Sequence, residues 1–159
     1  AGFGGRLSGA PGSWGAGRSL RVIWYHPGMP RMIAHMDMDA FFAAIEERDN
    51  PRWTGMPIVV GADPAVGRGV VSTANYKARE YGIRSAMPIT EAWRRAEEAR
   101  RKGEPAVIFL TGNYELYAEV SERIMAILEP CADAFEQASI DEAYLEWNFE
   151  FRISQQIRN

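Results

Sequence analysis

Four acidic side chains in two short stretches are the residues of this chain best suited to chemistry. Asp37 closes an apolar stretch, Asp39 follows two residues later, and the pair Asp141 and Glu142 stands between two further apolar stretches. A carboxylate at a strand end is costly to bury alone, and several together repel one another unless a cation lies among them. Hard divalent ions such as Mg²⁺ accept oxygen ligands of this kind and keep positions open for phosphates. The sequence therefore offers two groups of candidate metal ligands.

If the two groups meet in space, they predict a site for two Mg²⁺ ions. Such a pair, about 3.5–4 Å apart, activates an attacking hydroxyl and stabilises a leaving pyrophosphate. Spacing alone leaves open the alternative, in which each acid is a solvated turn residue. We interpret Asp39 as a helix cap rather than a ligand, and His35 as a strand residue rather than a catalytic base.

The elements that would position these acids follow from hydrophobic period and from turn residues. We expect strands at residues 32–36, 57–61, 69–73, 107–110, 135–139 and 143–147. We expect helices at residues 40–48, 75–81, 88–102 and 113–128. Strands that alternate with helices and then form a hairpin predict an α/β (α+β) fold, with an antiparallel or mixed sheet and helices on one face.

Charge and composition limit what the chain does alone. Its 159 residues suffice for one domain with a small insertion. Residues 1–31 hold four of the 18 basic residues and no acid, so the remainder has 14 basic and 21 acidic residues, a net charge of −7. A protein that grips DNA by its phosphates needs a basic surface, so most of that surface should lie outside this chain.

The absence of a long apolar run and the low cysteine content bear on membrane association and cellular compartment. No apolar run approaches the ~20 residues that cross a bilayer, which predicts no membrane partner. The single cysteine, Cys131, excludes an internal disulfide framework and is typical of a cytoplasmic protein; we expect it to be a buried apolar side chain.

Three stretches resemble the motifs of Y-family, or translesion, DNA polymerases, in the order that the family has them. Residues 36–46 (MDMDAFFAAIE) resemble its first motif, residues 72–79 (STANYKAR) with 82–88 (GIRSAMP) its fingers motif, and residues 139–145 (SIDEAYL) its acidic motif. The resemblance implies a ferredoxin-like palm with a small fingers insertion. It also implies palm at residues 32–48, fingers at 49–107 and palm again at 108–159, truncated before the thumb and little finger. Residues 1–31 are rich in glycine and arginine and lack helical or strand periodicity, which predicts a disordered leader, with a transit peptide as the alternative.

The resemblance also implies a role for each matching residue. Asp37, Asp141 and Glu142 match the family's catalytic, metal-binding carboxylates, and the backbone carbonyl of Met38 completes the ion on the nucleotide side. Phe42 matches the steric gate, an aromatic ring that leaves no room for a ribose hydroxyl.

Three further residues match those that hydrogen-bond the triphosphate of the incoming nucleotide: Thr73, Tyr76 and Arg79. Without the surrounding motifs, we would predict that Phe42 is a core residue and that Tyr76 and Arg79 are surface residues.

The implied activity is template-directed transfer of nucleotides from dNTPs to a primer 3′ end, in translesion synthesis and DNA repair. Its partners would be primer–template DNA, dNTPs, two Mg²⁺ ions, and a sliding clamp bound through a missing C-terminal region. We expect the chain by itself to polymerise poorly or not at all. The alternatives are a nucleotidyl cyclase-like palm enzyme and a non-catalytic truncated relative that acts through protein contacts.

Overall fold

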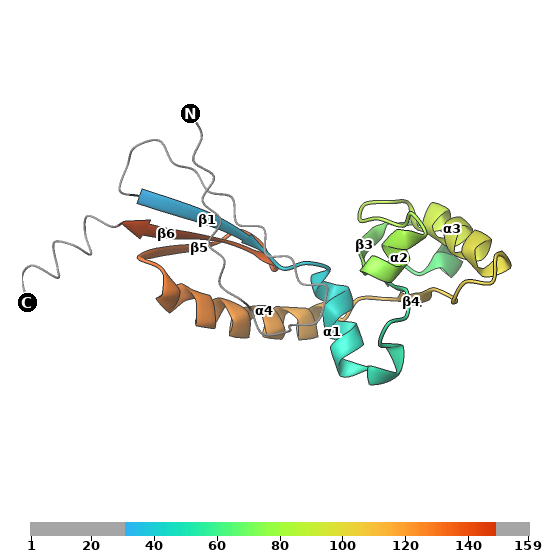
Figure 1. Cartoon of the computed structure of the whole chain (residues 1–159), viewed down its shortest axis with the longest axis horizontal. Helices are drawn as coiled ribbons and strands as arrows, with labels where there is room; N and C mark the ends of the chain where they lie inside the picture. The colour runs from blue at the N-terminus through green and yellow to red at the C-terminus, as the bar shows by residue number, and fades with distance from the viewer. Residues whose placement is uncertain (1–30, 149–159) are drawn as a thin grey trace, which may run out of the picture.

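The first sheet brings together segments from both ends of the folded chain. Strands β1 (Arg31–Asp37), β6 (Glu142–Asn148) and β5 (Ala134–Gln137) lie side by side in that order, and both pairings are antiparallel. The structure, a computed structural model, describes residues 31–148. The hairpin predicted around the acidic pair is confirmed as β5–β6, and helix α4 (Tyr114–Leu128) lies along one face of this sheet (Figure 1).

Strand alternation decides which residues of this sheet face the helix. Successive side chains of a strand point to opposite faces. Met36, Ala143 and Leu145 are buried and pack around Met125 of α4. The residues between them in sequence therefore lie on the face away from α4, and Asp37 is one of these.

The second sheet is smaller and mixed. Its strands β2 (Ile58–Gly61), β3 (Val71–Ala74) and β4 (Ile108–Leu110) have the order β3-β2-β4, with β3 antiparallel and β4 parallel to β2. Helices α2 (Tyr76–Glu80) and α3 (Ile89–Arg101) belong to this lobe (Figure 1), and their apolar residues share one buried cluster with Val59 and Val71. Single 3₁₀ turns are η1 (Pro51–Trp53), η2 (Pro64–Val66) and η3 (Glu129–Cys131).

Helix α1 (Phe41–Asp49) lies where the two lobes meet. Its buried residues Phe41 and Ile45 share a core cluster with Ile58 and Val60 of β2 and with Tyr117 of α4. A packed core of this kind resists deformation, so the lobes are held together by interior contacts rather than by a loose linker.

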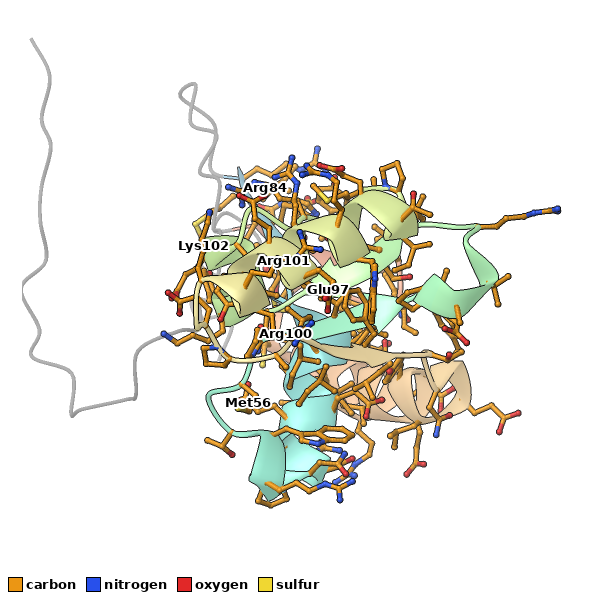
Figure 2. The ribbon with its side chains drawn as sticks, turned by 90° about the vertical axis from the view of Figure 1, so that its right-hand side faces the viewer. Met56, Arg84, Glu97, Arg100, Arg101 and Lys102 are labelled. Atoms are coloured by element: carbon orange, nitrogen blue, oxygen red, sulfur yellow. The ribbon has the colours of Figure 1, made fainter. Side chains whose placement is uncertain are left out.

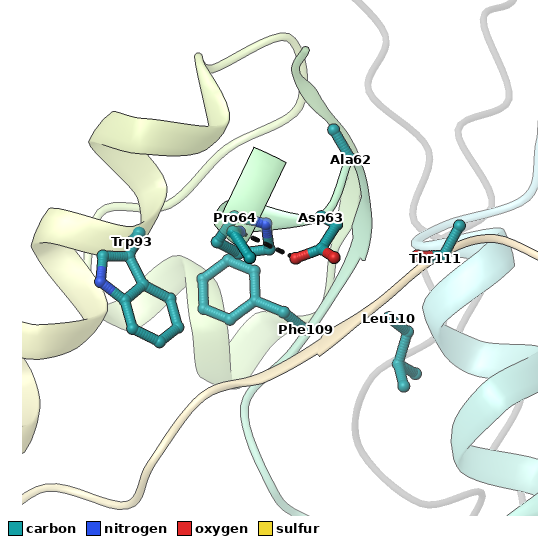
Figure 3. Close-up of a pocket in the computed structure, with 8 residues that line it drawn as sticks. Ala62, Asp63, Pro64, Trp93, Phe109, Leu110 and Thr111 are labelled. Carbon is teal, nitrogen blue, oxygen red and sulfur yellow. Dashed lines mark hydrogen bonds between the residues drawn. The ribbon is translucent and has the colours of Figure 1, made fainter. Parts of the chain in front are cut away.

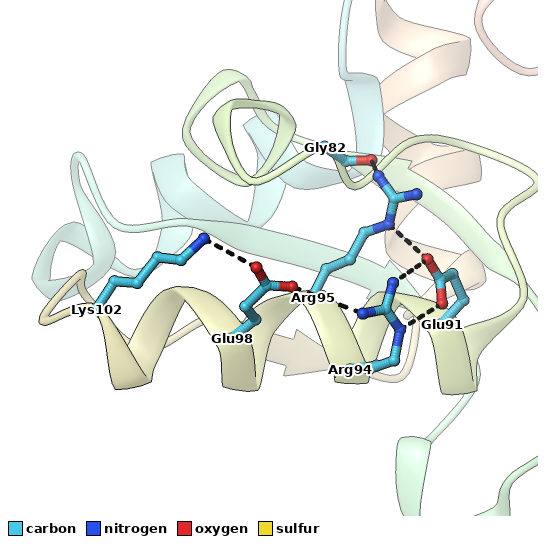
Figure 4. Close-up of polar contacts among 6 residues, drawn as sticks. All are labelled: Gly82, Glu91, Arg94, Arg95, Glu98 and Lys102. Atoms are coloured by element: carbon cyan, nitrogen blue, oxygen red, sulfur yellow. Dashed lines mark hydrogen bonds and ion pairs between the residues drawn. The ribbon is translucent and has the colours of Figure 1, made fainter.

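Ionic contacts brace the turn between α2 and α3. Glu91 accepts two hydrogen bonds from Arg94 and one from Arg95 (Figure 4), and the bonds to these two arginines lower the pKa of Glu91 to about 2. Arg95 also donates to the carbonyl of Gly82 at 2.8 Å. Gly82 has a φ of 77°, in the left-handed region that glycine adopts after a helix end.

The predicted elements are all found, with three differences. Strand β4 pairs with β2, so its residues 108–110 belong to the second sheet, although the motifs suggested that the first domain resumes at residue 108. Strand β1 begins at Arg31, and the rest of the expected leader, residues 1–30, lies outside the described residues. The expectation that Cys131 is buried was wrong: it is exposed, and its thiol donates to the Ile127 carbonyl in the turn after α4.

Candidate functional site

Two of the predicted acids face each other across a strand pair. In the register of β1 and β6, Asp37 is directly opposite Glu142, on the face away from α4. Asp37 is half-buried and has no hydrogen-bond or ion-pair partner among residues 31–148. Like charges directly opposite in a sheet destabilise it. An unpaired, half-buried carboxylate opposite another carboxylate is therefore an arrangement that a cation would stabilise.

The third acid lies next to this pair in the turn before β6. The backbone carbonyl of Asp141 accepts a hydrogen bond from the Met38 N–H at 2.9 Å, which ties the turn to the end of β1. The Asp141 carboxylate accepts a hydrogen bond from the Ser139 hydroxyl at 2.8 Å. This hydrogen bond holds the Asp141 side chain within its own turn.

The predicted metal ligands are brought together only in part. Among residues 31–148, no three His, Cys, Asp or Glu side chains are gathered closely enough to hold an ion as they stand. The donor chemistry nevertheless fits a hard divalent cation, because the acids offer oxygen ligands and Asp37 and Glu142 have no Lys or Arg partner in the described part of the chain. The assignment of Asp37, Asp141, Glu142 and the Met38 carbonyl as ligands stays a prediction.

His35 lies beside the paired acids on the same face. Its Nε2 is 3.9 Å from a Glu142 carboxylate oxygen, too far for a hydrogen bond, and is buried without a partner. Its ring stacks on Tyr144, with centroids 4.6 Å apart. The side chain is thus a packed strand residue, as the sequence suggested.

The predicted triphosphate residues come from the second lobe. Thr73 is half-buried on β3, and Tyr76 and Arg79 lie on α2, with the Arg79 guanidinium 4.8 Å from the centroid of the Tyr76 ring. Arg79 Nε donates to the Ala74 carbonyl at 2.8 Å. The two side chains therefore form one stacked unit anchored to the end of β3.

Asn75 fixes the helix that presents them. Its side-chain oxygen accepts hydrogen bonds from the N–H of Ala78, within α2, and from the N–H of Ile58, in β2. Its amide donates to the Met56 carbonyl at 2.8 Å. Asn75 is buried with all three bonds made, so α2 is attached directly to the central strand of its sheet.

Asp39 contacts both members of the stacked unit, which the sequence analysis missed. The Tyr76 hydroxyl donates to one carboxylate oxygen of Asp39, and Arg79 Nη1 is 3.3 Å from the other. This hydrogen bond to Asp39 raises the pKa of the Tyr76 phenol. The expectation that Asp39 caps a helix was wrong: Ala40 holds the N-cap position of α1, in a left-handed conformation, and no side chain caps the helix there.

Phe42 belongs to an aromatic group at the junction of the lobes. Its ring stacks on Tyr117 with centroids 4.5 Å apart and an interplanar angle of 14°, and it meets the edge of Tyr114. Tyr117 is fully buried and donates to Glu46 at 2.6 Å; burial and this bond raise the pKa of its phenol. Phe42 is half-buried, so part of its ring stays accessible for contact with a ligand.

A hollow of about 510 Å³ lies elsewhere in the second lobe, between η2, α3 and β4 (Figure 3). Its walls include Asp63, Pro64, the half-exposed Trp93 and Phe109, whose ring centroid is 5.4 Å from that of Trp93. None of the predicted site residues lines it. It is therefore distinct from the site described above.

The fold and the paired strand-end acids define the class of protein: the palm and fingers of a Y-family DNA polymerase. One similar solved structure is DinB from Sulfolobus solfataricus. It aligns with a TM-score of 0.62 and 37% sequence identity, and the alignment covers 80% of this chain and 36% of DinB. An insertion ternary complex of Dbh DNA polymerase has the same TM-score, 36% identity and coverage of 78% and 33%. A Y-family chimera of Dbh and Dpo4 aligns with a TM-score of 0.64.

The chain belongs to the impB/mucB/samB family, whose model matches residues 36–155. DNA polymerase IV of Streptococcus pyogenes serotype M2 (strain MGAS10270) is 53% identical over 118 residues, which are 73% of this chain and 30% of that protein. The chain thus spans about a third of the length of the curated relatives it matches. Within residues 31–148, no helix has the length and hydropathy of a membrane span.

Proposed function

We propose that this chain supplies the palm and fingers of a translesion DNA polymerase, which transfers nucleotides from dNTPs to a primer 3′ end. The observation that carries this proposal is the pairing of Asp37 with Glu142 at the end of β1 and β6 nearest α1. The family match and the relatives named DNA polymerase IV support it. We assign the lobe of β1, β5, β6 and α4 as the palm and the lobe of β2, β3 and β4 as the fingers.

In this proposal the acids hold two Mg²⁺ ions at the end of the palm sheet nearest α1. Asp37 and Glu142 face each other and would share an ion, with Asp141 and the Met38 carbonyl as the remaining protein ligands. Bound there, the ions would supply charge stabilisation and an activated 3′-hydroxyl. The relatives named DNA polymerase IV are bacterial, and bacterial DNA lies in the cytoplasm, which supports a cytoplasmic location as part of this proposal.

The fingers residues orient the nucleotide. Arg79 offers a planar fork of N–H donors, which suits phosphate oxygens taken in pairs. Its attachment to the Ala74 carbonyl and its stacking on Tyr76 reduce the freedom that it would lose on binding. Thr73 precedes Ala74 in β3, and its side-chain hydroxyl adds a further donor for the phosphates.

The test is metal-dependent nucleotide binding by the 159-residue chain. We expect dATP to bind in the presence of Mg²⁺ in isothermal titration calorimetry, and the affinity to fall when EDTA removes the metal. Asp37→Asn should weaken the Mg²⁺-dependent affinity by about 10-fold or more, since even the outer-shell partners of metal ligands are worth 10–100-fold.

A matched control is Glu122→Gln, which neutralises an exposed carboxylate on α4 and should leave dATP binding unchanged. Equal binding by wild type and Asp37→Asn would contradict the metal assignment. Circular dichroism of both variants verifies that the fold is retained.

A further inference from the structure

Asp39 is a carboxylate that the proposed function does not use, yet it holds two residues that the function needs. Asp39 lies between β1 and α1, in the palm, and its side chain contacts Tyr76 and Arg79 in the fingers. Its side chain is only 16% exposed, so the contact is partly shielded from water. A hydrogen bond to a charged group in such a place is worth more than one in open solvent.

Tyr76 and Arg79 differ in how many hydrogen-bond donors remain free once they contact Asp39. A phenol has one O–H and donates to one acceptor at a time, whereas a guanidinium has five N–H donors. Tyr76 spends its only donor on Asp39. Arg79 uses one donor on Asp39 and one on the Ala74 carbonyl, and keeps others for a ligand.

A phosphate oxygen could therefore bind Arg79 without disturbing Asp39, but it could accept from Tyr76 only by replacing Asp39. We propose that Asp39 is a positioning residue that occupies the Tyr76 hydroxyl until the triphosphate of a nucleotide takes its place. This inference rests on the proposed function, since it concerns the same nucleotide site. Arg79 then lies between the two anions, Asp39 and the phosphate.

The exchange has an electrostatic consequence. The carboxylate and the triphosphate are both anionic and compete for one phenol and one guanidinium, so the charge of Asp39 opposes nucleotide binding. Removing that charge while keeping a side chain of the same shape should strengthen binding. A residue that merely supported the fold, or that bound the nucleotide itself, would have the opposite effect.

The experiment is a double-mutant cycle on the 159-residue chain, with dATP and Mg²⁺ in isothermal titration calorimetry. Asp39→Asn should lower the Kd for dATP by about 3- to 10-fold, the size of the net contribution of one ordinary hydrogen bond. In the wild-type background, Tyr76→Phe should change the Kd by less than about 2-fold. The substitution removes the hydrogen bond to Asp39 in the free protein and the hydrogen bond to the phosphate in the complex, so the two losses cancel. In the Asp39→Asn background it should raise the Kd by about 5- to 10-fold.

Asp63→Asn is the matched control. Asp63 is an exposed carboxylate of the fingers lobe, bonded to the Ala65 N–H, and its neutralisation should not change the Kd. Weaker or unchanged binding by Asp39→Asn, or additive effects in the cycle, would overturn the exchange while leaving the polymerase proposal in place. Failure of the wild type to bind dATP would overturn both.

A second readout reports the contact without any nucleotide. With tyrosine labelled at Cζ, NMR follows the phenol of Tyr76 as the pH rises; its loss in Tyr76→Phe assigns the signal. The hydrogen bond to Asp39 raises the Tyr76 pKa, so Asp39→Asn should lower it toward its ordinary value. An unchanged titration would show that the hydroxyl is not held by Asp39, and would overturn the inference.

Discussion

At the scale of single residues, Phe42 shows how a core contact and a ligand contact share one side chain. The stacking of its ring on Tyr117, itself held by Glu46, fixes the ring plane before any nucleotide is present. A rigid aromatic surface discriminates by excluding atoms, and this requires that it not move aside. The aromatic neighbours are therefore as important to the proposed steric gate as Phe42 itself.

We predict that Phe42→Ala removes the discrimination between sugars. The ratio of the Kd for ATP to the Kd for dATP, measured by calorimetry with Mg²⁺, should fall by about 10-fold or more, since contacts of one small group are worth 10–200-fold in a fitted pocket. Phe42→Tyr keeps the ring and should keep the ratio. An unaltered ratio in Phe42→Ala would show that another residue excludes the ribose hydroxyl.

Residue types and spacing predicted some of this site, and they missed the part that depends on tertiary contacts. The motifs located Asp37, Phe42, Tyr76 and Arg79. The contact of Asp39 with α2 joins residues about 40 positions apart, and a local cap was the simpler expectation for an acid before a helix. No local pattern signals such a contact, because it arises only when the palm and fingers pack together.

At the scale of elements, the turn between β1 and α1 determines how the acids and Phe42 are presented. Ala40 has φ 49° and ψ 36°, a left-handed conformation that a side chain with Cβ disfavours. Residues held in such regions gather at functional sites because the surrounding contacts enforce them. Here Ala40 is held from both sides: the Met38 N–H donates to the Asp141 carbonyl before it, and the Ala44 N–H donates to the Ala40 carbonyl in the first turn of α1.

Ala40→Gly should therefore stabilise the protein. Glycine adopts this conformation without the steric penalty of about 1 kcal/mol, and part of that gain is lost to its greater freedom when unfolded. The same substitution at Ala44, exposed within α1, should destabilise by about 0.5–1 kcal/mol. Urea unfolding of both variants checks the opposite signs; equal destabilisation would mean that Ala40 is not strained.

Most of the helices and strands could be predicted because their signals are local. The apolar stripe of α4 and the hairpin of β5 and β6 are set by neighbouring residues. The pairing of β4 with β2 could not be predicted in this way, since parallel strands meet only through a long crossover connection. Ala40 gave no signal either, because its conformation is imposed by contacts on both sides.

At the scale of the whole molecule, the lobes differ in charge. Residues 58–110 carry nine Lys or Arg and six Asp or Glu, a net +3, whereas the other described residues carry four and fourteen, a net −10. Arg84, Arg100, Arg101 and Lys102 lie toward the far end of the fingers lobe (Figure 2). The fingers lobe is therefore the more favourable of the two for anions, and the acidic palm is the more favourable for cations.

The junction core should make the two lobes unfold together. Ile58 is fully buried there, between α1 and α4, so Ile58→Ala should cost about 2–5 kcal/mol of unfolding free energy. Ile127→Ala, at a position 69% exposed on α4, should stay within about 0.5 kcal/mol. Thermal unfolding followed by tryptophan fluorescence and by circular dichroism should give one midpoint for each variant; two separated transitions would contradict a shared core.

The unbroken pairing of β1 with β6 also bears on how this sequence can vary. The pairs run from Arg31 and Asn148 to Asp37 and Glu142 without a bulge. Losing or gaining a single codon inside either strand would turn Leu145 or its neighbours outward and carry an acid into the apolar interior. An exposed position such as Ile33 tolerates a change of residue, whereas a change of strand length shifts the register, so natural variants should keep insertions and deletions to the loops.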